Sequence, residues 1–259
     1  RMSLPHTRQR MTTGRVEATA TTLYATAIHG SKVLISRETI MSKTNFHCLW
    51  VVGLILALAG PTRGQSQTFD IYWVDVEGGA ATLLVSPTGE SLLVDTGFPG
   101  MENRDANRIF AATQEAGLTR IDYLIITHFH RDHVGGLQAL DGMIPIGHCF
   151  DHGTNTEKDN QRWVDEYLGI CRNKRTALQA GQQLRLGDIE IDIVASDGRL
   201  ITTPVNRGGL NPLCATAEHK PQASPENQRS VGALFTYGRF TFLDLGDFNW
   251  AKEVELACP

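Results

Sequence analysis

The sequence predicts an α/β domain built from layers of sheet and helix, and three observations lead to this prediction. Short β-type runs at 68–76, 81–86 and 91–97 are separated by Glu-Gly-Gly and Pro-Thr-Gly-Glu turn signals, which indicates neighbouring antiparallel strands. A stretch with helical spacing at 104–117 precedes a nearly continuous apolar run at 121–127, of the kind buried on both faces of a sheet. Antiparallel order and strand–helix–strand order therefore occur in one chain, which is typical of layered α/β domains.

The remaining elements fit the same class. In chain order we expect a short helix, a strand, a second helix and a cleanly alternating strand, at 133–142, 143–150, 159–173 and 188–196. A loop rich in Pro, Gly and Asn spans about 197–229, and residues 230–247 read as a hairpin. The segment 249–259 looks like the opening of a helix. We therefore assign residues 66–259 to one domain.

The amino-terminal part is excluded from that domain. Residues 41–64 follow the order of a secretory signal peptide, because Met41 and Lys43 precede an apolar run from about 48 to 59 and a small or polar stretch follows it. The run is shorter than the roughly 20 residues of a spanning helix, with an uncleaved membrane anchor as the alternative. Residues 1–40 show no sustained period, and we interpret them as a non-native or disordered extension. These features predict an exported protein, periplasmic or extracellular.

The composition limits the kinds of partner that the protein is expected to bind. The formal net charge of −4 gives no electrostatic footprint for a dedicated nucleic-acid-binding patch, and membrane contact is expected only through an uncleaved signal segment. Export permits disulfides. Four cysteines lie outside the signal segment and allow three pairings, with free buried cysteines as the alternative: Cys149, Cys171, Cys214 and Cys258. The pairing and the oligomeric state stay open.

Three of the nine histidines lie in one short stretch, DYLIITHFHRDHVGG at 122–136. His128 and His130 are two positions apart, so an extended backbone points both side chains the same way. Asp132 and His133 are adjacent where the next helix begins, and they must point elsewhere. One loop can thus build two adjoining metal positions, and imidazole with carboxylate suits Zn²⁺, Mn²⁺ or Fe. Surface histidines without a metal are the alternative.

These residues resemble a known family. The segment T-H-F-H-R-D-H (127–133) resembles the H-x-H-x-D-H signature of the metallo-β-lactamase fold hydrolases, and LLVDTG (92–97) and FLDLGD (242–247) resemble two further motifs of that family. The resemblance spans about residues 68–257. Within the family, the strand segments around these motifs are most similar to the ComEC/Rec2-type branch, which is associated with DNA uptake.

The resemblance implies a four-layer αβ/βα sandwich with a metal site along one edge of the two sheets. It also implies a ligand set that holds two Zn²⁺ ions in an intact domain, with Mn²⁺ or Fe as alternatives: His128, His130, Asp132, His133 and Asp247. Asp247 would bridge the two ions. Asp95, with Gly97 beside it, would brace the ligand loop through hydrogen bonds without binding metal.

Two departures from the family pattern put part of this ligand set in doubt. The third motif supplies a histidine in the family, and ENQRSVGALF stands in its place here. His152 and His219 are the nearest replacements, with loop or capping roles as the alternative. The histidine of the fifth motif does not occur before Pro259. We therefore expect a C-terminally truncated domain with an incomplete second sheet, and a fragment of this kind can lack activity.

The expected function is a metal-dependent hydrolase. A metal-bound hydroxide would attack the substrate, and Asp132 would be the catalytic residue that orients it and accepts its proton. A phosphodiester substrate follows from the ComEC/Rec2 resemblance, and a lactone or β-lactam amide is the alternative that export favours. A non-catalytic binding module with a vestigial metal site is the second alternative. The residues alone do not select among these substrates.

Overall fold

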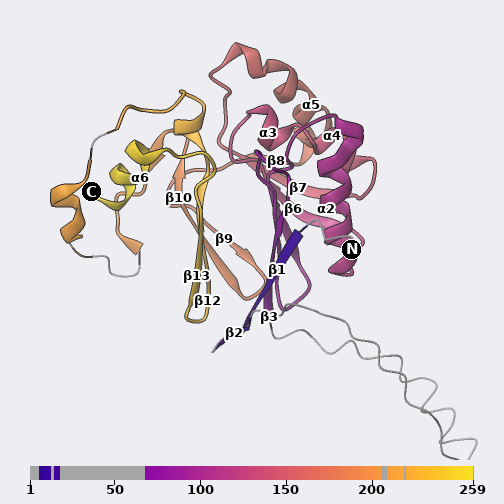
Figure 1. The fold of residues 1–259 in the computed structure, drawn as a ribbon, viewed down its shortest axis with the longest axis horizontal. Helices are drawn as coiled ribbons and strands as arrows, with labels where there is room; N and C mark the ends of the chain where they lie inside the picture. The colour runs from indigo at the N-terminus through magenta and orange to yellow at the C-terminus, as the bar shows by residue number, and fades with distance from the viewer. Residues whose placement is uncertain are drawn as a thin grey trace, which may run out of the picture. The chain divides into compact units, whose positions relative to one another are not determined.

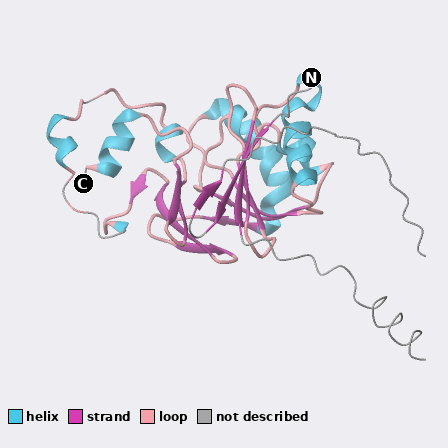
Figure 2. Ribbon diagram, turned by 60° about the horizontal axis from the view of Figure 1, so that its bottom comes forward, coloured by secondary structure: helices cyan, strands magenta, loops and turns pink. Residues whose placement is uncertain are grey.

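The computed structural model describes residues 6–12, 15–17, 68–205, 209, 211–218 and 220–258. In this part of the chain two β-sheets face each other, and helices flank them on both sides (Figure 1, Figure 2). The predicted α/β class and the αβ/βα order of layers are confirmed. None of the helices in the described ranges has the length and apolar character needed to cross a bilayer. The predicted signal segment at 41–64 lies outside the described residues.

The first sheet has the strand order β2-β1-β3-β4-β5-β6-β7-β8. Pairing is antiparallel from β2 to β5 and parallel from β5 to β8. The predicted strands at its centre form as expected. The bounds are β1 His6–Thr12, β2 Arg15–Glu17, β3 Thr68–Val74, β4 Thr82–Val85, β5 Ser91–Val94, β6 Ile121–Ile125, β7 Ile146–Asp151 and β8 Arg175–Ala177.

Strands β1 and β2 differ from the sequence expectation. We excluded residues 1–40 from the fold, whereas residues 6–12 pair with β3 along its whole length and residues 15–17 pair with β1. The physical reason is that β3 would otherwise present a row of unpaired backbone N–H and C=O groups, which an added strand satisfies. Such pairing depends on backbone groups and leaves little trace in the side-chain pattern. The rest of 1–40 lies outside the described residues.

Helices cover the outer face of the first sheet. The helix expected at 104–117 is α2 (Arg104–Glu115), preceded by η2 (Met101–Asn103). The short helix expected at 133–142 is split into α3 (Arg131–Val134) and α4 (Leu137–Asp141). The helix expected at 159–173 is α5 (Gln161–Cys171), flanked by η3 (Lys158–Asn160) and η4 (Arg172–Lys174). Their apolar faces pack on the sheet through side chains such as Ile109, Leu140 and Tyr167.

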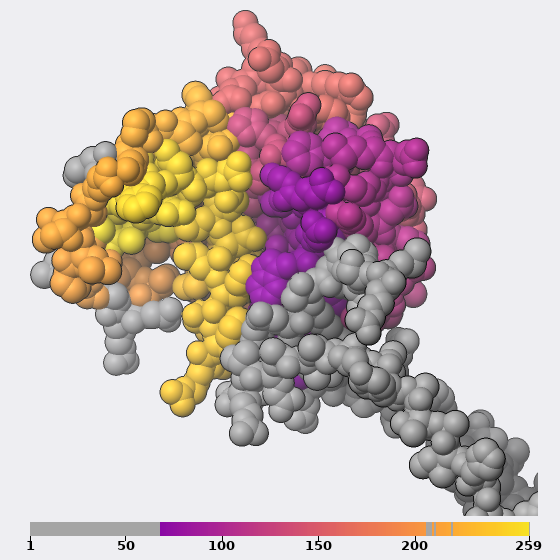
Figure 3. Space-filling model, in the orientation of Figure 1, coloured from indigo at the N-terminus to yellow at the C-terminus, as the bar shows by residue number. Residues whose placement is uncertain are grey.

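The second sheet packs against the opposite face of the first. Its strands are β9 (Gln183–Leu186), β10 (Ile189–Ser196), β11 (Arg199–Leu200), β12 (Gly232–Tyr237) and β13 (Phe240–Asp244). The predicted hairpin at 230–247 is β12–β13. Its ring contacts with the first sheet include Trp73–Phe242 at 5.9 Å between centroids, and Figure 3 shows this hairpin, in yellow, against the purple strands of the first sheet. The long loop contains η6 (Pro212–Thr216) and η7 (Asn227–Arg229), and α6 (Trp250–Ala257) lies beside the outer face of the second sheet.

Two disulfides form in the described part of the chain, and they settle the pairing that the sequence left open. Cys149–Cys171 joins β7 to the end of α5, and Cys214–Cys258 joins the long loop to the end of α6. The bridges span 22 and 44 residues. In the chain-entropy model, loops of these sizes correspond to about 3–4 kcal/mol of stabilisation each.

Candidate metal centre

The histidine loop is held by the centre of the first sheet. It follows β6, which lies between the parallel strands β5 and β7, so its position is fixed by hydrogen bonding on both sides. The backbone oxygen of Thr127 accepts the N–H of Val231 at 2.9 Å, which ties the loop to the start of β12 in the other sheet. His128 is fully buried, His130 directly precedes α3, and His133 lies buried inside α3. The loop is therefore braced by both sheets.

Asp247 reaches this loop through a glycine. Gly246, directly before it, has a φ of +53° in the left-handed region that favours glycine. A Cβ at this position would lie 2.8 Å from the Cβ and Oγ1 of Thr127. The close approach of the two backbones brings Asp247 to the histidines, and a side chain at 246 would separate them.

The structure brings four of the predicted ligands together. Nε2 of His128 lies 3.0 Å from Nδ1 of His130. Nε2 of His133 lies 3.2 Å from Oδ1 of Asp247, and Nε2 of His128 lies 3.9 Å from Oδ2 of the same carboxylate. Ligand atoms of His128, His130 and Asp247 all fall within 4.8 Å of one another. These distances are those of side chains that share one centre.

Asp95 stabilises this cluster through hydrogen bonds. It is completely buried directly after β5, with a φ of +60°. Its Oδ1 accepts the backbone N–H of Thr127 at 2.8 Å, and its Oδ2 accepts the Thr127 hydroxyl at 2.7 Å. The same Oδ2 lies 2.7 Å from Nδ1 of His133. One carboxylate therefore anchors the histidine loop and one of its imidazoles.

The outward hydrogen bonds of the histidines decide which nitrogens face the centre. Because the Thr127 hydroxyl donates to Asp95, its oxygen is free to accept the Nδ1 proton of His128 at 3.1 Å. Nδ1 of His133 donates to Asp95, and Nε2 of His130 donates to Glu157 at 2.9 Å. The inward nitrogens of His128 and His130 then each carry a lone pair and lie 3.0 Å apart, so both can bind one cation. The donor set, neutral imidazole plus carboxylate, fits Zn²⁺.

Burial and charge set the protonation of the cluster. Burial lowers the pKa of His128 far below its ordinary value, and the neighbouring His133 and His130 lower it further, so this imidazole is neutral. Burial disfavours the charged form of His133 as well, but Asp95 and Asp247 outweigh it and raise the pKa of His133 to about 10. The hydrogen bond from His133 lowers the pKa of Asp247. A cation that binds here must therefore displace a proton from His133.

Asp132 and Gly97 lie at the rim of this cluster. Oδ2 of Asp132 is 3.8 Å from Nε2 of His133, and its backbone oxygen accepts the N–H of Ala80 at 3.2 Å. Gly97 has a φ of +70°, and its N–H donates to the oxygen of Ala80 at 2.9 Å. The turn after β3 thus holds both the Asp132 segment and the loop after β5.

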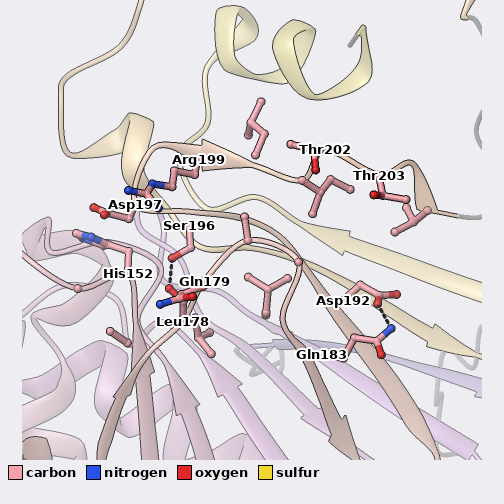
Figure 4. Close-up of a pocket in the computed structure, with 18 of the residues that line it drawn as sticks. His152, Leu178, Gln179, Gln183, Asp192, Ser196, Asp197, Arg199, Thr202 and Thr203 are labelled. Carbon is pink, nitrogen blue, oxygen red and sulfur yellow. Dashed lines mark hydrogen bonds between the residues drawn. The ribbon is translucent and has the colours of Figure 1, made fainter.

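Of the two replacement ligands, the structure describes only His152, and this residue does not join the cluster. His152 is buried, but its Nε2 lies 2.7 Å from Oε1 of Glu226, so the structure differs from the expectation that it binds metal. Its other side lines a polar cavity of about 660 Å³, whose walls include Gln179, Ser196 and Arg199 (Figure 4). His219 lies outside the described residues.

Sequence reasoning missed Glu226 and Glu157. Oε1 of the buried Glu226 accepts the N–H of Phe129, between the two histidines, at 3.1 Å. Its Oε2 accepts the backbone N–H and the hydroxyl of Thr156 at 2.9 and 2.7 Å. The only signal was the departure from the third motif, because Glu226 begins the ENQRSVGALF segment that replaces it. For Glu157, in a polar loop, the sequence held no signal.

We expect Glu226 to contribute to acid stability. Burial raises the pKa of this carboxyl, but the hydrogen bonds and charge of His152 and the Thr156 donors prevail and lower it to about 2. A lowered folded pKa means that the stabilisation is present above about pH 4.5 and is lost as the pH falls towards 2. The difference in free energy of unfolding between wild type and Glu226→Gln should shrink by about 3 kcal/mol from pH 5 to pH 2. Urea denaturation at several pH values measures it.

The control for this prediction is Glu190→Gln. Glu190 forms an exposed ion pair with Arg185, so its substitution should change stability by less than about 1 kcal/mol at either pH. A difference between wild type and Glu226→Gln that is the same at pH 5 and pH 2 would contradict the role given to Glu226.

Comparison with known proteins identifies what these residues are similar to. Residues 74–149 match the family model of the "Metallo-beta-lactamase superfamily". A stretch of 120 residues is 28% identical to hydroxyacylglutathione hydrolase of Xanthomonas axonopodis pv. citri, covering 44% of this chain and 36% of that protein. A stretch of 81 residues is 31% identical to coenzyme F420H(2) oxidase of Methanothermobacter marburgensis, covering 31% of this chain and 17% of that protein.

Solved structures include similar chains at low identity. A metallo-β-lactamase with a HARLDQ motif from Cronobacter sakazakii is 17% identical over 67% of this chain and 57% of that chain, with a TM-score of 0.41. The chain spans less than two fifths of the length of either curated relative. The family match includes the histidine loop and Asp95, whereas Glu226 and Asp247 lie beyond it.

Proposed function

We propose, from the metallo-β-lactamase superfamily domain that residues 74–149 carry, that this protein is a metal-dependent hydrolase. The convergence of His128, His130, His133 and Asp247 carries the proposal. The outward hydrogen bonds of His128 and His130 leave the lone pairs of their inward nitrogens directed at one centre, beside the Asp247 carboxylate. The hydrolase named among its relatives supports the same reaction class.

The chain's own residues supply binding and proton handling. His128, His130, His133, Asp247 and Asp132 would hold up to two Zn²⁺ ions, with Mn²⁺ or Fe as alternatives. Bound cations supply a lowered pKa for water and polarise the substrate's scissile group. Asp132 lies at the partly exposed rim of the cluster, where its Oδ2 can accept a proton from an attacking water.

We propose a phosphodiester as the substrate class. The support is the resemblance of the strand segments around residues 68–97 and 230–247 to the ComEC/Rec2-type branch. A carbonyl substrate, such as a lactone or β-lactam amide, is the second candidate, and the match to hydroxyacylglutathione hydrolase favours carbonyl chemistry. We further propose that the protein is exported, which the two disulfides support because they persist in oxidising compartments.

The test combines metal content and activity. Emission spectroscopy on the purified protein should find bound Zn²⁺, up to about two equivalents. Hydrolysis of bis-p-nitrophenyl phosphate should exceed that of nitrocefin and of a hydroxyacyl thioester, and His130→Ala should lower it by at least about 100-fold. The matched control is His148→Ala, since His148 lies outside the cluster and its Nε2 is bonded to the Thr176 hydroxyl at 2.8 Å.

Each result has a distinct meaning. Faster hydrolysis of nitrocefin or the thioester would replace the phosphodiester by a carbonyl substrate. Bound metal without hydrolysis of any of the three would favour a non-catalytic binding module. A protein that binds no metal, or a His130→Ala variant as active as the wild type, would overturn the hydrolase proposal.

A further inference from the structure

We propose that Glu157 is a positioning residue of the metal centre, whose carboxylate fixes the orientation of His130 so that Nδ1 faces the bound cation. The inference rests on the proposed function, because it needs a cation at the cluster. Glu157 lies outside every motif that the sequence resembles, and it comes from the loop between β7 and α5. Only the folded structure brings Glu157 close to the metal centre.

The hydrogen bond between Glu157 and His130 involves the nitrogen of His130 that faces away from the cluster. Oε2 of Glu157 lies 2.9 Å from Nε2 of His130, and Nδ1 of the same ring lies 3.0 Å from Nε2 of His128. An imidazole that donates from Nε2 keeps its lone pair on Nδ1. Glu157 therefore selects the tautomer in which the inward nitrogen can bind a cation. Asp95 makes a comparable contact with the outward nitrogen of His133.

Glu157 is itself held in place at both carboxylate oxygens. Oε1 accepts the backbone N–H of Glu226 at 3.2 Å, and Oε2 also accepts the amide of Asn160 at 3.2 Å. Its backbone N–H and oxygen bond to the side chain of Asn155 at 3.1 and 2.8 Å. A glutamate has several rotatable bonds, and these contacts leave it one arrangement. The carboxylate is thus fixed before any cation arrives.

Glu226 connects this loop to the histidines. One of its carboxylate oxygens accepts the N–H of Phe129, and the other accepts from Thr156, the neighbour of Glu157. The loop that carries Glu157 and the loop that carries His130 are therefore joined through one buried carboxylate. This explains how a polar loop can hold an imidazole within hydrogen-bonding distance.

A role as a direct metal ligand is the competing interpretation. Glu157 contacts the nitrogen of His130 that is turned away from His128, and within the described residues it forms no hydrogen bond or ion pair with His128, His133 or Asp247. A ligand would have to approach the inward nitrogens. The geometry therefore favours a carboxylate that acts through His130.

The test compares metal binding in Glu157→Gln and Glu157→Leu with that of the wild-type chain. We expect Glu157→Leu to bind Zn²⁺ about 10- to 100-fold more weakly, measured by competition with a chromophoric chelator. Glu157→Gln keeps an acceptor oxygen and should fall between the two. With Co²⁺ in place of Zn²⁺, the visible absorption bands should shift while the number of bound ions stays the same.

The matched control is Glu166→Leu. Glu166 is similarly exposed and pairs with Arg162 on α5, so its removal should leave Zn²⁺ affinity and the Co²⁺ spectrum unchanged. If Glu157→Leu does not fold, Glu157→Gln decides, with an expected loss of about 3- to 10-fold. Wild-type affinity and spectrum in the Glu157 variants would overturn the inference while the proposed function stands. Loss of one whole metal equivalent in both would make Glu157 a ligand and also overturn it. Absence of metal from the wild type would remove the proposed function and the inference together.

Discussion

Replacing Asp95 by asparagine should lower the affinity for Zn²⁺ by about 10- to 100-fold and the free energy of unfolding by about 2–4 kcal/mol. Asp95 accepts three hydrogen bonds, two from Thr127 and one from His133. An asparagine has one acceptor oxygen and must turn its NH₂ group towards one of these donors. If the NH₂ faces His133, Nδ1 must accept this hydrogen bond and the imidazole keeps its proton on Nε2, where it competes with the cation. If the NH₂ faces the Thr127 N–H, two donors oppose each other.

The Asp95→Asn substitution should not strain the backbone. Asparagine tolerates the left-handed φ of +60° at position 95 nearly as well as aspartate does. The matched control is Asp122→Asn at the opposite end of β6, because Asp122 accepts the N–H and the hydroxyl of Ser91, each at 3.0 Å. It should lose stability without losing Zn²⁺ affinity. Titration with a chelator and urea denaturation measure both quantities, and an Asp95→Asn variant with wild-type affinity would contradict the role of Asp95.

Gly136→Ala should destabilise the protein by about 3 kcal/mol or more. Gly136 has helical φ and ψ angles of −77° and −11°, so alanine suits its backbone. An added Cβ would nevertheless lie 2.1 Å from the backbone oxygen of Thr96. The N–H and the hydroxyl of Thr96 both donate to the oxygen of His133, at 2.6 and 2.9 Å. The methyl group would push apart the two loops that carry Asp95 and His133, so Zn²⁺ affinity should fall together with stability.

Gly169→Ala is the counterpart of this variant. Gly169 lies on the exposed side of α5, and a Cβ there meets nothing within 4 Å. Alanine in a helix interior should stabilise the protein by about 0.5–1 kcal/mol. The same substitution, glycine to alanine, should therefore lower the melting temperature at position 136 and raise it at position 169. Thermal unfolding of both variants and the wild type measures these changes. Equal melting temperatures for Gly136→Ala and the wild type would show that the Thr96 loop can move aside.

Local patterns predicted the parts of the fold in which side chains alone decide the structure. The runs at 68–76 and 121–127 became β3 and β6 because they bury apolar residues, and the spacing at 104–117 became α2 for the same reason. Strands β8 and β9 were missed because their sequences, RTA and QLRL, are only three and four residues long. They form because neighbouring strands offer free backbone groups, which a single segment does not reveal.

The residues of the candidate site also differ in how far the sequence predicts them. His128, His130 and His133 could be predicted because three imidazoles lie within six positions, and Asp95 and Asp247 followed only from the family resemblance. Glu157 and Glu226 could not be predicted, since their roles depend on contacts between loops that are distant in the sequence. Phe129 and Glu226, for example, are 97 positions apart. His152 had the chemistry of a ligand, but its bond to Glu226 holds it away from the cluster. Residue type indicates what a side chain can bind, and the fold decides which partner it meets.

The Cys214–Cys258 bridge changes what a cut in the backbone would do. A protease that cleaved the exposed chain between these two cysteines, for example near Gln222, would produce two polypeptides that remain covalently joined. The fragment carrying β12, β13 and α6 would stay attached to the rest of the molecule, and Asp247 would remain tethered near the imidazoles. Only the combined loss of a peptide bond and of the sulfur–sulfur bond would let that fragment diffuse away.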